Sequence, residues 1–151
     1  MGRVSGKVAI ITGGARGQGA VEGRLLASEG AEVILTDVLD DEGEAVAAAI
    51  GEHASYLHHD VTNEDDWSAV VETVLGRHGQ VDVLVNNAGV FRLLPAVDTS
   101  LEVWEQVIAV NQTGVFLGMR AVAPAMVERQ RGSIINISSV AGLMGGALSV
   151  A

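Results

Sequence analysis

A glycine-rich segment directly follows an apolar run near the start of the chain, and this order restricts the fold more than any other feature. The run is residues 8–11, Val-Ala-Ile-Ile, and the segment is residues 12–19, Thr-Gly-Gly-Ala-Arg-Gly-Gln-Gly. A buried strand that passes through glycines into a helix can form a phosphate-binding site, because the start of the helix offers free N–H groups to the anion. Gly13 would turn the chain sharply, Gly17 would leave room for a pyrophosphate, and Gly19 would let the helix pack closely. Glycines also serve ordinary turns, so the loop alone is a weak indication.

Strand-like and helix-like segments alternate along the chain without a linker. The predicted strands are 8–11, 32–36, 54–58, 81–85 and 133–137, and the predicted helices are 17–29, 41–50, 63–78 and 101–129, the last interrupted by Gly114, Gly118 and Pro124. Alternation at this spacing implies right-handed crossovers and an α/β fold, a Rossmann-type doubly wound parallel sheet with strand order 3-2-1-4-5. We therefore predict one dinucleotide-binding domain over residues 1–151.

Composition agrees with a buried sheet and excludes several classes of protein. Hydrophobic residues make up 48% of the chain but aromatic residues only 3%, so aliphatic side chains must fill the core, as in a parallel sheet covered on both faces. The net charge of −10 argues against binding to nucleic acid or an anionic membrane. The sequence has no cysteine, no apolar run near the ~20 residues that span a bilayer, and no signal-peptide core. We expect a cytoplasmic enzyme.

Asp37 closes the second predicted strand, about 20 residues after the glycine loop. A carboxylate there can accept hydrogen bonds from both ribose hydroxyls of an adenosine, and it repels a 2′-phosphate, which favours NAD over NADP. Arg16 inside the loop is the counter-evidence, because a guanidinium can pair with a 2′-phosphate. The structural alternative for Asp37 is a solvent-facing turn residue beside Asp40 and Asp41.

Further motifs follow at fixed places: Asp60-Val61, Asn86-Asn87-Ala88-Gly89, Asn111 and Ile137-Ser138-Ser139. Together with the glycine loop, they stand in the order and spacing of the short-chain dehydrogenase/reductases, a family that the sequence resembles over essentially its whole length. Within that family, segments 36–40, 110–116 and 138–145 look most like bacterial 3α,20β-hydroxysteroid dehydrogenases. The resemblance implies an NAD(H)-dependent oxidoreductase that interconverts a secondary alcohol and a ketone, with a steroid-like substrate as one option.

The resemblance also implies which residues hold the cofactor. They are Gly13, Arg16, Gly17, Gln18, Gly19, Asp37, Asp60, Val61, Asn87, Ala88 and Gly89. Asp60 would hydrogen-bond the adenine amino group beside the Val61 backbone, and Gly89 would allow the nicotinamide ribose to approach. The structural alternative for Asp60 is a turn at the end of a strand.

Two residues are implied to be catalytic. Ser139 would point its hydroxyl at the substrate carbonyl or alcohol; Ser138 has the same chemistry, and spacing alone does not separate the two. Asn111 lies inside a predicted helix, where Asn is a poor helix former. In the family it binds a water that extends a proton relay. A turn serine and a helix-packing hydrogen bond are the structural alternatives.

The family's proton-transfer pair, a Tyr followed four residues later by a Lys, does not occur in the sequence. An unperturbed phenol with a pKa of about 10 is a poor base at neutral pH, so the Lys has to lower that pKa. The single tyrosine is Tyr56, the single lysine is Lys7, and position 60 is Asp. In the resembling enzymes the Tyr follows the serine at a distance that falls at or just beyond Ala151.

We therefore expect a chain truncated before this pair, without the C-terminal strands and helices of the family. An apolar, glycine-rich tail over residues 141–151 supports truncation, because it ends without a cap. Such a chain alone would be inactive, and the alternative function is a non-catalytic dinucleotide-binding fragment. Related enzymes are commonly tetramers built partly through the helix over 101–129, so we expect a homotetramer in the full-length form, acting on a small-molecule alcohol or ketone.

No metal site is expected. His58 and His59 are adjacent, so on a strand they point to opposite faces, and no second ligand cluster supports them. Trp67 and Trp104 lie on amphipathic predicted helices, which favours core or interface positions over contacts to a cofactor.

Overall fold

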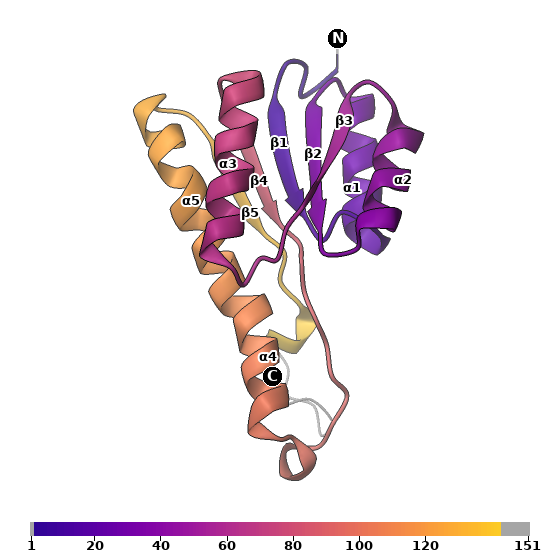
Figure 1. Cartoon of the computed structure of the whole chain (residues 1–151), viewed down its shortest axis with the longest axis vertical. Coiled ribbons are helices and arrows are strands. Elements are labelled where there is room, and N and C mark those ends of the chain that lie inside the picture. The colour runs from indigo at the N-terminus through magenta and orange to yellow at the C-terminus, as the bar shows by residue number, and fades with distance from the viewer. Residues whose placement is uncertain (1, 143–151) are drawn as a thin grey trace.

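A five-stranded parallel sheet forms the centre of the protein, and its strand order, β3-β2-β1-β4-β5, is the predicted one (Figure 1). The computed structural model describes residues 2–142, so most of the tail over 141–151 and the end of segment 138–145 lie outside the described residues. The strands are β1 (Val8–Thr12), β2 (Glu32–Asp37), β3 (Ala54–His58), β4 (Val83–Asn86) and β5 (Ser133–Asn136). The helices are α1 (Gly17–Ser28), α2 (Asp40–Ile50), α3 (Glu64–His78), α4 (Leu101–Ile108) and α5 (Val115–Glu128).

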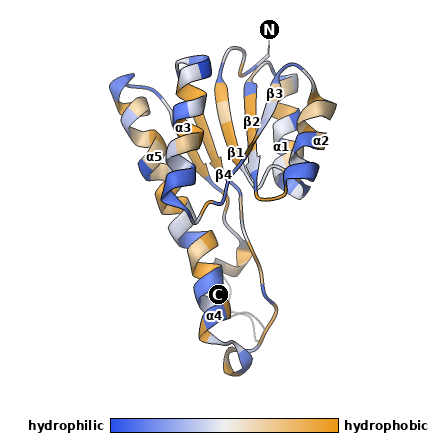
Figure 2. Ribbon diagram, in the orientation of Figure 1, coloured by the Kyte–Doolittle hydropathy of each residue, from blue (hydrophilic) through white to orange (hydrophobic). Residues whose placement is uncertain are grey.

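Successive residues of the strands point into two separate cores, one on each face of the sheet. The core beside α3 and α5 contains Ile10, Ile34, Leu84, Trp67, Val70, Val74, Leu117 and Val122. The core beside α1 and α2 contains Ile11, Val33, Leu35, Val85, Ala27 and Ala47. Aliphatic side chains dominate both cores, as the composition indicates, and β1, β2 and β4 stand out as hydrophobic in Figure 2. Trp67 is a core residue with 1% of its surface exposed, whereas Trp104 is exposed.

The predicted helix over 101–129 is a long rod in which a π-helical section, Ala109–Gly114, joins α4 to α5. The rod extends past the carboxyl edge of the sheet, together with the connection from β4 to α4 (Figure 1). Gly114, Gly118 and Pro124 do not interrupt it: Pro124 lies inside α5, and the two glycines allow close packing. A Cβ at Gly114 would come within 2.9 Å of Cγ2 of Val61, and one at Gly118 within 2.7 Å of the Trp67 ring. No pattern in the sequence predicts the π-helical section, a feature often found at functional sites.

Asp82, just before β4, holds the amino edge of the sheet together. It is 4% exposed. Its carboxylate accepts a hydrogen bond from the Val8 N–H at 3.0 Å, and it lies 3.0 Å from Arg131 Nη2, 3.5 Å from Lys7 Nζ and 3.6 Å from Arg129 Nη1. Burial raises the pKa of Asp82, but the Val8 and Arg131 hydrogen bonds and the neighbouring cations outweigh burial and hold that pKa below its usual range.

Candidate functional site

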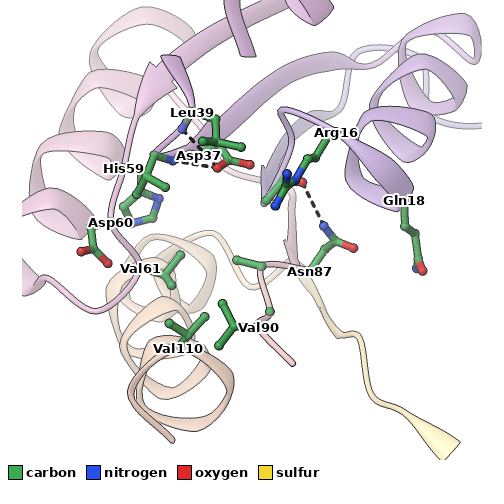
Figure 3. A pocket seen from close by; sticks show the side chains of 14 residues that line it. Arg16, Gln18, Asp37, Leu39, His59, Asp60, Val61, Asn87, Val90 and Val110 are labelled. Carbon is green, nitrogen blue, oxygen red and sulfur yellow. Dashed lines mark hydrogen bonds between the residues drawn. The ribbon is translucent and has the colours of Figure 1, made fainter. Parts of the chain in front are cut away.

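A cavity of about 370 Å³ opens at the carboxyl edge of the sheet, where the chain leaves β1, β2, β3 and β4. It is lined by Gly13, Arg16, Gln18, Asp37, Val38, Leu39, His59, Asp60, Val61, Asn87, Ala88, Gly89, Val90 and Val110 (Figure 3). The strand order reverses between β1 and β4, and ligands of open α/β sheets bind at such a point. The volume falls within the range of small-molecule and cofactor pockets.

The glycine loop forms the turn that the sequence predicts. Gly13 has φ +67°, and a Cβ there would lie 2.8 Å from the Ala88 Cα, so both the turn and the close approach require glycine. Gly17 has φ +55°, and a Cβ there would meet no heavy atom within 4 Å. Gly19 packs the start of α1 against the Gly13 carbonyl and Asn87. Gly17 and Gly19 thus shape the loop without lining the cavity.

The start of α1 carries no side-chain cap. Arg16 is its N-cap, in extended conformation, and the first turn has no acidic residue. In contrast, the side chain of Asn63 caps α3 and that of Ser100 caps α4. The free N–H groups of an uncapped helix start are satisfied by water or by an anionic ligand. Gln18 donates to Glu22 Oε1 at 2.8 Å, and its side chain lies apart from the other labelled residues in Figure 3.

Asp37 is fixed at the cavity by backbone N–H groups. Its Oδ2 accepts a hydrogen bond from the Ala15 N–H at 3.1 Å, and its Oδ1 accepts from Val38 at 2.8 Å and from Leu39 at 3.3 Å. A carboxylate has about four lone-pair sites, so three donors leave room for a ligand hydroxyl. Asp37 therefore makes the contacts of a turn residue, which is the structural alternative to a cofactor role. The same contacts hold its carboxylate at the cavity, which Arg16 also lines.

Asp60 and His59 form the end of the cavity beyond β3. Asp60 Oδ1 accepts from the N–H and the hydroxyl of Thr62, at 2.9 and 2.8 Å, so Asp60 makes the strand-end turn as well as lining the cavity. The sequence interpretation missed His59, which is 1% exposed. Its Nδ1 lies 2.9 Å from Thr36 Oγ1 and its ring meets Trp67 edge to face. Burial lowers the pKa of His59 to about 4, against the nearby acidic charges.

His58 points away from its neighbour, as expected for adjacent residues on a strand. It is exposed, and its Nδ1 lies 2.8 Å from Asp40 Oδ1. Over residues 2–142 no group of three or more His, Asp or Glu side chains is placed to hold a metal ion.

The segment after β4 is hydrogen-bonded to the glycine loop. Asn87 Nδ2 donates to the carbonyls of Thr12 at 2.9 Å and Gly13 at 3.2 Å, and the Thr12 hydroxyl accepts from the N–H groups of Asn87 and Ala88, both at 3.0 Å. These four hydrogen bonds lock two loops that are distant in sequence into one wall of the cavity. Gly89, the next residue of this wall, adds no side chain to it.

Asn111 makes the packing hydrogen bonds that we weighed as the alternative to catalysis. Its Oδ1 accepts from the Val90 N–H and its Nδ2 donates to the Val90 carbonyl, both at 2.8 Å. Asn111 therefore holds the backbone beside Gly89. It does not itself line the cavity, although its neighbour Val110 does.

Ser139 lies after β5, exposed, with its Oγ accepting from the Ala141 N–H at 3.2 Å. It does not line the cavity either. The single tyrosine and the single lysine are far from forming a pair: Tyr56 lies in β3 and Lys7 lies beside Asp82 at the amino edge. The structure thus brings most predicted cofactor residues together, and it places neither predicted catalytic residue in the cavity.

Apolar side chains that the sequence interpretation missed complete the cavity. They are Val38, Leu39, Val90 and Val110. Each lies within two positions of a predicted site residue, so extending each motif by its neighbours would have found them. The cavity thus offers a surface for each part of a dinucleotide. The apolar side chains suit a base, the N–H groups at the Gly13 turn and the uncapped start of α1 suit phosphates, and the Asp37 carboxylate suits ribose hydroxyls.

Comparison with known proteins agrees with this geometry. The sequence model of the family described as short chain dehydrogenase matches residues 7–151. A 3-alpha-(or 20-beta)-hydroxysteroid dehydrogenase of Mycobacterium tuberculosis is 51% identical over 144 residues, which are 95% of this chain and 55% of the relative. A cyclopentanol dehydrogenase of Comamonas testosteroni is 46% identical over 148 residues, 96% of this chain and 59% of the relative. The chain spans little more than half the length of these curated relatives.

A solved structure is similar in fold and sequence. It is the crystal structure of a metagenomic short-chain oxidoreductase in complex with NADP, with a TM-score of 0.91 and 42% identity. The match covers 97% of this chain and 68% of that one.

None of the helices that the structure describes over residues 2–142 is long and apolar enough to cross a membrane.

Proposed function

The chain belongs to the short-chain dehydrogenase family, and we propose that it forms the dinucleotide-binding domain of an NAD(H)-dependent oxidoreductase that interconverts a secondary alcohol and a ketone. The observation that carries this proposal is the cavity at the reversal of strand order, where the Gly13 turn, the start of α1 and the Asp37 carboxylate meet. When bound, a nicotinamide ring gives or takes the hydride of such a reaction. The residues of this chain bind and orient it.

The position of Asp37 supports NAD as the cofactor. Its carboxylate is fixed at the cavity by three N–H groups, so a 2′-phosphate placed there meets a negative charge, whereas ribose hydroxyls meet an acceptor. Arg16 in the same cavity and the NADP in the related crystal structure favour the competing proposal, NADP. The relative affinities for NAD and NADP decide between the two.

The relatives support a cyclic secondary alcohol as substrate. One is named for 3-alpha- or 20-beta-hydroxysteroids and one for cyclopentanol, and the 3-hydroxyl of a steroid and the hydroxyl of cyclopentanol are both secondary alcohols on a ring. A steroid-like substrate is the narrower form of this proposal. Ser139 is the residue that we propose to hydrogen-bond the reacting oxygen, and Asn111 is the residue that we propose to bind a water that extends a proton relay.

The alternative proposal is a fragment that binds a dinucleotide without turnover. It is favoured by the absence of a Tyr-x-x-x-Lys pair from the 151 residues. Tyr56 and Lys7 also lie apart, the first within β3 and the second beside Asp82 at the amino edge of the sheet. A phenol without a cation beside it keeps a pKa too high for base catalysis at neutral pH. The two proposals share the cofactor site and differ only in chemistry.

The test measures NADH formation by absorbance, with cyclopentanol and a 3α-hydroxysteroid as substrates and NAD as cofactor. It is run on the 151-residue chain and on any longer product of the same gene. Turnover that Ser139→Ala lowers by about a hundredfold or more, with the Kd for NAD unchanged, supports the oxidoreductase proposal. Ser138→Ala is the matched control, since it removes a neighbouring hydroxyl at the same strand end. NAD binding without turnover in every form supports the fragment instead.

Assembly and location stay predictions. Exposed apolar residues lie along the long rod, namely Leu101, Trp104, Phe116 and Val127, and on β5, namely Ile134 and Ile135. Such surface supports the proposal of a homotetramer in the full-length form, because large exposed apolar areas mark interaction sites. Sedimentation of the full-length protein tests the tetramer, and cell fractionation tests the cytoplasmic location.

A further inference from the structure

Tyr56 lies outside the cavity but contacts the backbone of the residue that we assign to the ribose. It stands in β3, opposite Leu35 of β2, and its ring packs on α2 where Gly43 leaves no side chain; a Cβ there would overlap with the ring. The phenol oxygen lies 2.6 Å from the Asp37 carbonyl oxygen and 2.9 Å from Asp40 Oδ1. Both are acceptors, so the single O–H of Tyr56 is the donor that they share.

The phenol thereby joins both ends of the turn from β2 to α2. Asp37 is the last residue of β2 and Asp40 the first of α2. Asp40 Oδ1 also accepts from His58 Nδ1 at 2.8 Å, which holds Asp40 against β3. Burial and the neighbouring Asp40 carboxylate raise the pKa of Tyr56 above its usual range, so the O–H that bridges the turn is present at neutral pH.

The turn that Tyr56 holds is also the turn that aims the Asp37 carboxylate. Two of the three N–H groups on that carboxylate, those of Val38 and Leu39, belong to the turn itself. If the turn shifts, these donors move and the carboxylate follows them or loses them. The orientation of Asp37 therefore depends on a hydroxyl that does not itself line the cavity.

We propose that Tyr56 is a positioning residue that determines cofactor choice: by holding the turn between Asp37 and Asp40, it keeps the Asp37 carboxylate facing the adenosine ribose. This inference rests on the proposed function, since it needs a dinucleotide in the cavity. Without the phenol hydroxyl the turn is held less tightly, and the Ala15 N–H is the one donor on the carboxylate that lies outside the turn. NAD then loses an acceptor, a 2′-phosphate loses a repelling charge, and Arg16 remains for that phosphate.

The test is the ratio of the Kd for NADPH to the Kd for NADH, measured by fluorescence titration of the 151-residue chain with these reduced dinucleotides. Tyr56→Phe keeps the ring on Gly43 and removes only the hydroxyl. One hydrogen bond corresponds to a fall of this ratio by about threefold to tenfold. In an Asp37→Ala background the same substitution should leave the ratio unchanged, because there is no carboxylate left to position.

Asp40→Ala is the second variant, and it decides the question if Tyr56→Phe does not fold. It cuts the α2 end of the bridge, and the ratio should fall by at least about twofold. Glu32→Ala is its matched control: Glu32 makes a similar carboxylate–imidazole contact, 2.7 Å to His53, at the opposite end of β2, and its removal should leave the ratio unchanged.

The outcomes separate the inference from the proposed function. If the unsubstituted chain binds neither dinucleotide, the proposed function fails and the inference fails with it. If the chain binds NAD but Tyr56→Phe changes both Kd values equally or not at all, Tyr56 is only structural and the inference alone is overturned. A lower ratio in Tyr56→Phe that persists undiminished in the Asp37→Ala background also overturns it.

Discussion

Asn111→Ala should loosen the segment between β4 and α4, because Asn111 holds the Val90 peptide with both ends of its amide. The two hydrogen bonds measure 2.8 Å each. A hydrogen bond contributes about 0.5–1.5 kcal/mol net, and exposure of the Asn111 side chain to water favours the lower part of that range. Loss of the pair should cost about 1–2 kcal/mol of local stability, which corresponds to an exchange of the Val90 amide hydrogen that is about 5–30 times faster.

The assay is native-state hydrogen exchange followed by NMR, with the Val90 amide as the reporter and core amides of β1 as internal reference. Gln112→Ala is the control, since Gln112 is the next residue of the same π-helical section and is also exposed. It should leave the Val90 rate within about twofold of the original. If Asn111→Ala also leaves that rate unchanged, Asn111 does not hold the Val90 peptide at the wall of the cavity.

Asp37→Ala should weaken NAD binding about tenfold or more, because charge-assisted hydrogen bonds are worth about 1.5–3 kcal/mol. It should strengthen NADP binding, because the charge that repels the 2′-phosphate is gone. Titration with both dinucleotides checks this, and an unchanged preference contradicts it. The lowered pKa of Asp82 means that its contribution to stability is complete above its unfolded pKa of about 4 and is lost as pH falls through the lower folded value. Urea unfolding should show Asp82→Asn less stable at neutral pH and closer to the original in acid. His59, with its pKa lowered by burial to about 4, should make the fold lose stability as pH falls from about 6.5 towards 4. His59→Gln should remove that part of the pH dependence in the same measurements.

The sheet could be predicted from the sequence because local signals agree with one another. Apolar runs mark the strands, glycines or acidic residues mark where they end, and right-handed crossovers in a Rossmann-type doubly wound sheet favour the strand order that is found. Small differences occur at the ends: β2 includes Asp37, and β4 begins at Val83 rather than 81. The cavity could be predicted to the same extent, since the residues that follow parallel strands meet at one edge of the sheet.

Contacts that depend on side-chain direction could not be predicted. Tyr56 reaches Asp37 across 19 positions and Asn87 reaches Thr12 across 75, and no local pattern encodes either distance. Asn111 shows the same limit, because its spacing fits a proton relay and a packing hydrogen bond equally well. Its amide in fact holds Val90.

Direct binding of NAD(H) to the 151-residue chain tests the central claim, that the edge of the sheet around Gly13 and Asp37 is a dinucleotide site. The measurement is an NMR titration of the amide-labelled chain with NAD. We predict saturable shifts of the amides in 13–19, 37–39, 60–61 and 87–90, the segments at the cavity, and none at the amino edge around Asp82. An unchanged spectrum at millimolar NAD, or shifts confined to residues outside these segments, would contradict the claim.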